Sequence, residues 1–108
     1  MEQHAAALQE LYNRVPRRHS ADNVKEINGI LDEYENILGA IEGLNSWYEK
    51  NTAPLYPSLD GIRNTIKMST SNKASKKGKD DFFDEASGQL KDDIQSLINI
   101  YGDGTKTA

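Results

Sequence analysis

Large apolar residues recur at steps of three and four over residues 22–50, and this spacing constrains the fold more than any other feature of the chain. It places them on one side of an α-helix, which turns once in about 3.6 residues. A second apolar row lies beside the first, a width that suits packing against two neighbours better than a two-stranded coiled coil. We predict one long amphipathic helix over residues 22–50. The main row is Val24, Ile27, Leu31, Tyr34, Leu38, Ile41, Asn45 and Tyr48, and the second row is Ile30, Ile37 and Leu44.

Three other segments carry the same helical spacing. They cover residues 3–15, 58–70 and 80–101, and nothing in the pattern predicts a strand. The chain has 108 residues, which suits a single domain. We therefore expect an all-α fold, a small antiparallel helical bundle of about four helices with a long second helix.

Residues that disfavour helix continuation set the predicted ends of these segments. Ser58 is expected to cap the third helix after a proline-containing break. Residues 69–79 contain no large apolar side chain, so a mobile basic loop is expected before the last helix. Gly102 is a natural helix stop. The bundle domain is thus predicted over 1–101, with 102–108 as a disordered tail.

Composition excludes several classes of protein. The chain has no cysteine, which rules out disulfides and thiolate metal sites. No stretch approaches the roughly 20 apolar residues of a membrane span, and the start of the chain does not read as a secretory signal. We expect a cytoplasmic protein, with export by a non-classical bacterial route as the alternative.

Motifs that would support catalysis are missing from the sequence. The two histidines, His4 and His19, lie near no serine–acid pattern, and no glycine-rich phosphate loop occurs. The carboxylates of the second helix lack the Glu-x-x-His spacing of a bundle di-metal site. We therefore predict a non-catalytic protein with no cofactor and no metal.

Three glycines interrupt the long predicted helix on the side away from its apolar stripe. Gly29, Gly39 and Gly43 each cost about 1 kcal/mol relative to alanine in a helix interior. Small residues four positions apart leave a shallow trough in which a second helix can approach closely. The plain alternatives are tolerated surface glycines or a bend near Gly39. The predicted partner-binding residues on this outer face are Asp32, Glu33, Asn36, Gly39 and Gly43, with Trp47 at the rim.

Charge is unevenly distributed along the chain. Residues 22–49 carry seven acids and one base, whereas residues 61–79 carry six bases and no acid. The acids would steer a basic protein partner, and the bases would hold phosphates of nucleic acid or an anionic membrane surface. No aromatic residue interleaves the bases for base stacking, and both stretches are also typical of plain solvated surfaces. The candidate anion-binding residues are Arg63, Lys67, Lys73, Lys76, Lys77 and Lys79.

These observations favour a non-catalytic helical protein–protein interaction protein, such as an adaptor, an inhibitor, a secretion chaperone or an assembly subunit. It would bind a protein partner, or copies of itself, through the outer face of the second helix. The alternatives are a nucleic-acid-associated factor that uses residues 63–79 and an exported filament or tip subunit. The sequence does not name the partner.

Overall fold

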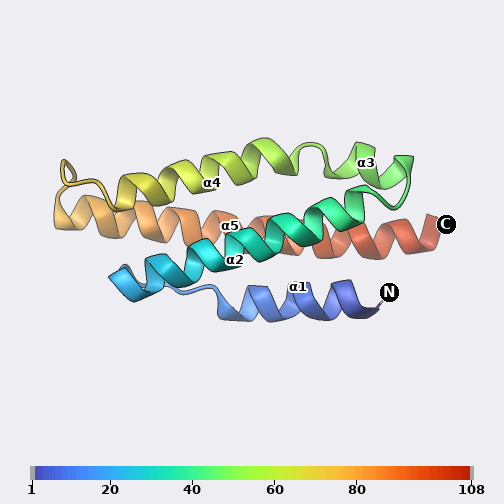
Figure 1. Ribbon diagram of the computed structural model, residues 1–108, viewed down its shortest axis with the longest axis horizontal. Coiled ribbons are helices and arrows are strands. Elements are labelled where there is room, and N and C mark those ends of the chain that lie inside the picture. The colour runs from blue at the N-terminus through green and yellow to red at the C-terminus, as the bar shows by residue number, and fades with distance from the viewer. Residues whose placement is uncertain (1, 108) are drawn as a thin grey trace.

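The structure is a computed structural model that describes residues 2–107. Its helices are α1 (Glu2–Arg14), α2 (Ala21–Glu42), α3 (Ser46–Thr52), α4 (Leu55–Ser69) and α5 (Lys76–Thr107). They form a rod of 49 × 22 × 16 Å (Figure 1). The described residues contain no strand, and the predicted all-α antiparallel bundle is confirmed.

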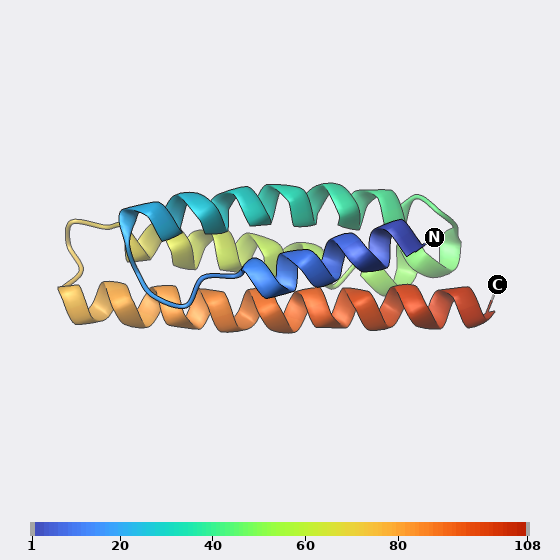
Figure 2. The same ribbon diagram turned by 90° about the horizontal axis from the view of Figure 1, so that it is seen from below.

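α5 runs the length of the bundle, and α1, α3 and α4 pack against it. Both α1 and α4 run antiparallel to α5, whereas α2 runs parallel to it (Figure 1). Figure 2 shows α2 and α5 on opposite sides of the rod, with α1 and α4 between them. The outer faces of α2 and α5 therefore point in opposite directions.

The core consists of the apolar rows that the sequence spacing predicts. Along α2 the buried side chains follow steps of three and four, as expected for one face of a helix. α5 contributes a matching row on the opposite side of the core, and Leu8 and Leu11 of α1 close one flank. The fully buried large side chains include Leu8, Ile27, Ile30, Leu31, Tyr34, Leu38, Ile41, Leu59, Ile62, Phe83, Leu90 and Ile94.

The predicted single helix over residues 22–50 is wrong at its C-terminal end. α2 ends at Glu42, and Gly43 is its C-cap residue. The side chain of Asn45 then accepts a hydrogen bond from the backbone N–H of Tyr48 at 3.0 Å and caps α3. A polar asparagine side chain gains little from packing in an apolar row, whereas at a helix start it can accept a hydrogen bond from a free backbone N–H. The chain therefore turns here and begins α3. Leu44 lies in the turn and is 51% exposed, not part of the second apolar row.

The last helix begins earlier than predicted and ends later. The hydroxyl of Ser75 accepts a hydrogen bond from the backbone N–H of Gly78 at 3.0 Å, which caps the start of α5. The connecting loop is therefore residues 70–75 only. At the other end, α5 passes through Gly102 to Thr107, so the described part of the predicted disordered tail is helical.

The start of α4 also differs from the prediction. The helix begins at Leu55, three residues before Ser58, and Pro57 lies in its first turn. Proline is tolerated there because the N–H it lacks would have no partner inside the helix. Ser58 is therefore not a cap, and its hydroxyl is free to bond with another helix.

The buried Tyr34 makes the stability of the bundle sensitive to alkaline pH. Its hydroxyl donates to the backbone carbonyl oxygen of Asp93 at 3.4 Å, and burial, followed by the nearby Asp93 carboxylate, raises the pKa of Tyr34. A raised pKa in the folded state gives stability that is complete below the unfolded value of about 10 and falls as pH rises above it. We expect Tyr34→Phe to flatten this alkaline loss.

Urea unfolding at about pH 8 and about pH 11 measures the effect. A smaller slope remains in the variant, because burial also raises the pKa of Tyr48 and of Tyr56. An alkaline loss of stability equal to that of the parent chain would contradict the assignment to Tyr34.

Candidate protein-binding site

The outer face of α2 is an open, smooth surface between Gly29 and Gly39. A Cβ atom added at Gly29 would have no neighbour within 4 Å, and one at Gly39 would meet only the hydroxyl of Tyr56 at 3.9 Å. Asp32 and Asn36 lie between the two glycines and are exposed. The structure therefore brings these four residues to one solvent-facing side of α2.

Arginine side chains neutralise acidic residues on both flanks of this face. From α4, the Arg63 guanidinium lies 3.0 Å from an Asp32 carboxylate oxygen and 2.9 Å from one of Glu35. From α1, Arg14 lies 2.8 Å from Glu26 and 3.2 Å from Glu33. Exposed pairs of this kind contribute about 0–1 kcal/mol each to stability. They still reduce the net charge that Asp32 and Glu33 present to a partner.

Gly43 and Trp47 do not extend this face. Gly43 lies in the turn after α2, and Trp47 belongs to α3. The half-buried ring of Trp47 packs edge-on against Tyr48, with centroids 5.3 Å apart. The predicted partner-binding set is thus divided between two helices, and only its α2 members share one face.

The candidate anion-binding residues are also divided. Arg63 lies in the middle of α4, where it contacts two carboxylates. Lys67 is in the last turn of α4 and Lys73 in the loop. The remaining three, Lys76, Lys77 and Lys79, occupy the start of α5 instead of a mobile loop.

Two arginines that are not among the predicted anion-binding residues join this end of the bundle. Arg17 and Arg18, in the loop after α1, line a cleft together with Lys76. Nearly sixty residues separate them from Lys76 in the chain, so only the fold brings them together. The same cleft is lined by His19 and by three carboxylates, Asp80, Asp81 and Asp84. Its mixed charge does not match a polyanion.

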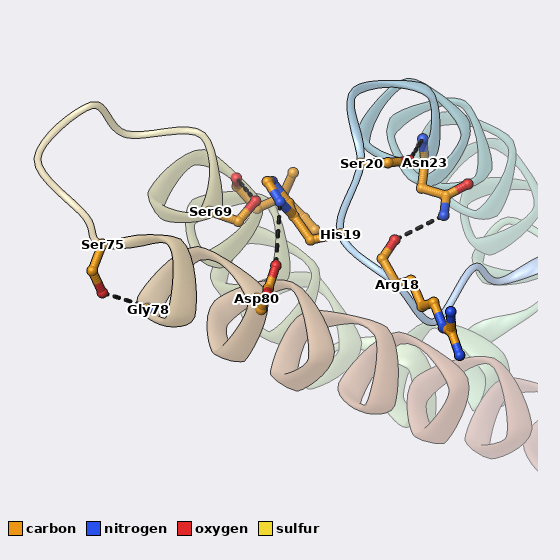
Figure 3. A network of polar contacts seen from close by, with 9 residues as sticks. Arg18, His19, Ser20, Asn23, Ser69, Ser75, Gly78 and Asp80 are labelled. Carbon is orange, nitrogen blue, oxygen red and sulfur yellow. Dashed lines mark hydrogen bonds and ion pairs between the residues drawn. The ribbon is translucent and has the colours of Figure 1, made fainter.

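Local hydrogen bonds hold the loop between α1 and α2 in place (Figure 3). His19 Nδ1 lies 3.6 Å from an Asp80 carboxylate oxygen, and the His19 ring packs edge-on against Phe83. The hydroxyl of Ser20 caps α2 by accepting from the N–H of Asn23, whose side-chain amide donates to the Arg18 carbonyl at 2.7 Å. These contacts therefore have a structural role, because they hold the loop in one conformation.

A buried carboxylate network joins α4 and α5, and sequence analysis did not predict it. Asp93 is 5% exposed, and its carboxylate accepts hydrogen bonds from the hydroxyl of Ser58 and, at 2.8 Å, from the amide of Gln89. The one available signal was the spacing of four between Gln89 and Asp93, which places them on one side of a helix.

A groove of about 240 Å³ runs beside this network between α4 and α5. Its walls are mostly small or polar side chains, and Ile62 and Ala86, both nearly fully buried, form its floor. The residues that line the groove are Ser58, Gly61, Ile62 and Thr65 of α4 and Glu85, Ala86 and Gln89 of α5.

Neither a metal-binding cluster nor a membrane span occurs in the part of the chain that the structure describes. Among residues 2–107, no three histidine or acidic side chains lie close enough together to hold a metal ion. None of the helices over the same range combines the length and apolarity needed to cross a membrane.

Comparisons of the chain with protein-family models, curated proteins and solved structures found no match.

Proposed function

We propose that this chain is a non-catalytic interaction protein that binds a helix of a protein partner across the outer face of α2. The open space over Gly29 carries the proposal, because apart from the adjoining backbone of α2 no atom lies within 4 Å of the position that a Cβ would take. Alanine would fit there and would stabilise the helix by about 1 kcal/mol. A glycine that the fold itself does not require is well suited to close approach by another backbone.

The neighbouring side chains support docking by close contact more than by charge. Asp32 is paired with Arg63, so it adds little net attraction for a basic partner. Asn36 is exposed between the glycines and offers an amide donor and a carbonyl acceptor to the partner. Nucleic acid is the less favoured partner, because three aspartates line the cleft that holds Arg17, Arg18 and Lys76.

We expect Gly29→Leu to reduce partner binding at least about tenfold, or about 1.4 kcal/mol. The leucine side chain would occupy the space in which the partner backbone approaches α2. The measurement is quantitative affinity capture from a lysate of the source cell. Hydrogen exchange of the captured complex then locates the protected residues. The matched control is Gly102→Leu on α5, outside this face, where a Cβ atom would likewise have no neighbour within 4 Å.

Equal capture by Gly29→Leu and the parent chain would overturn the proposal for the α2 face. So would protection that falls outside residues 25–42, or a loss of binding in the control variant alone. Light scattering of the purified chain over a concentration series decides whether the partner is a second copy.

A further inference from the structure

We propose that the groove between α4 and α5 is a second docking site, one that accepts a cationic amphipathic helix of a protein partner. It lies on a different pair of helices from the α2 face and does not depend on the function proposed for that face. Three features support it: open space along the groove, apolar side chains at one end and unpaired acids along α5.

Small residues leave space in and beside the groove. A Cβ atom added at Gly61 of α4 would have no neighbour within 4 Å, and the same holds at Gly88 of α5. Ser58 and Thr65 lie about one turn to either side of Gly61, so this wall has no large side chain. A partner side chain can therefore enter between the helices without displacing one that is already there.

Two apolar side chains continue the groove toward the α4–α5 loop. Helical spacing places Met68 one turn beyond Thr65, and Phe82 one turn before Glu85. Because the helices are antiparallel, both residues lie at the same end of the groove. Met68 is 40% exposed, and Phe82 is partly exposed and does not belong to the buried core cluster. Together they offer an apolar anchor point for a partner.

The acids along α5 indicate that a complementary partner would be positively charged. Asp81, Glu85, Gly88 and Asp92 follow each other at steps of four, three and four, which keeps them on one side of the helix. All three acids are exposed, and none forms an ion pair with another described residue. Asp81 also borders the cleft that holds Arg17 and Arg18, so the uncompensated charge beside the groove comes from Glu85 and Asp92. This differs from α2, where arginines pair with Glu26, Asp32, Glu33 and Glu35.

A positively charged helix complements this face, and its lysines or arginines would speed encounter and fix its register. A second copy of the chain fits less well. Its lysines at the start of α5, Lys76, Lys77 and Lys79, are followed by Asp80 and Asp81, so that segment is mixed in charge. A nucleic acid would be repelled by the acids along α5.

The test is an NMR titration of the ¹⁵N-labelled full chain with a designed peptide. The probe is an amphipathic helix of leucine and lysine, about 18 residues long so that it can form a helix. A matched peptide has glutamate in place of lysine. We expect chemical-shift changes from the lysine peptide at residues 58–68 and 82–92, and none of this kind from the glutamate peptide.

Two variants locate the site. Gly61→Leu fills the groove and Glu85→Lys reverses an exposed charge, and each is expected to weaken peptide binding at least about tenfold. Gly29→Leu, on the far side of the rod, is expected to leave the affinity unchanged. If Gly61→Leu fails to fold by circular dichroism, Glu85→Lys still decides the question.

Several results would overturn the proposal. Equal binding of both peptides, shifts confined to α2, or unchanged affinity in Glu85→Lys would each exclude the groove. Dimers whose footprint in the absence of peptide covers residues 58–68 and 82–92 would assign the groove to a second copy. Loss of affinity in Gly29→Leu alone would move the peptide to the α2 face and leave the proposed function standing.

Discussion

Replacing Gly104 by alanine is expected to lower the free energy of unfolding by up to about 2 kcal/mol, although alanine favours a helix. A Cβ atom at this position would overlap the ring of Tyr48. The ring cannot move without loss, because it is buried and its hydroxyl donates to the Tyr101 carbonyl oxygen at 2.9 Å. Overpacking costs about 1–3 kcal/mol, which at its upper end exceeds the helix gain of about 1 kcal/mol.

Gly102→Ala is the matched control for this prediction. It lies half a turn away in the same helix, and its Cβ position has no neighbour within 4 Å. It should therefore stabilise the protein by up to about 1 kcal/mol. Urea unfolding followed by far-UV circular dichroism measures both variants. In a Tyr48→Ala background the effect of Gly104→Ala should change sign, and equal effects at 102 and 104 would contradict the packing seen here.

Ser58→Ala is expected to destabilise the fold by about 2 kcal/mol, the range for a hydrogen bond to a buried charged group. The Asp93 carboxylate is almost fully buried and has two side-chain donors, the Ser58 hydroxyl and the Gln89 amide. Removing one leaves a buried charge with half of its side-chain hydrogen bonds, and the penalty falls on the folded state alone. Urea unfolding at neutral pH gives the value.

Thr65→Ala provides the comparison for Ser58→Ala. Thr65 also lines the groove on α4, but its hydroxyl donates to the carbonyl of Gly61 within the same helix and is exposed. Its removal should change the free energy of unfolding by no more than about 0.5 kcal/mol. Similar losses in the two variants would show that the Asp93 network contributes nothing of its own.

The fold class could be predicted because the apolar spacing repeats over most of the chain. The helix ends could not, since they depend on single residues with two plausible roles. Asn45 falls at a position of the apolar row and is also a good capping residue, and in the structure it caps α3. Ser75 lies in a stretch without large apolar residues, yet it starts α5. Gly102 is a common stop signal, but Gly104 packs under Tyr48 and the helix continues.

The candidate surfaces were predictable only in part. Periodicity placed Gly29 and Gly39 away from the apolar row, and both lie on the outer face of α2. The arginine partners of its acids come from α1 and α4, and one sequence gives no measure of such distances. The groove between α4 and α5 could not be predicted, because it depends on the relative register of two helices. The sequence also favoured a capping role for Ser58, which in the structure bonds to Asp93 instead.

The dominant place of α5 in the bundle has a consequence for synthesis on the ribosome. α1, α3 and α4 all rest on α5, yet it is the last of the described helices to be made. Each earlier helix leaves the exit tunnel before the surface that it will cover exists. Until α5 emerges, the nascent chain therefore carries the uncovered apolar sides of α1 and α4, and this is the interval in which a chaperone would have most to do.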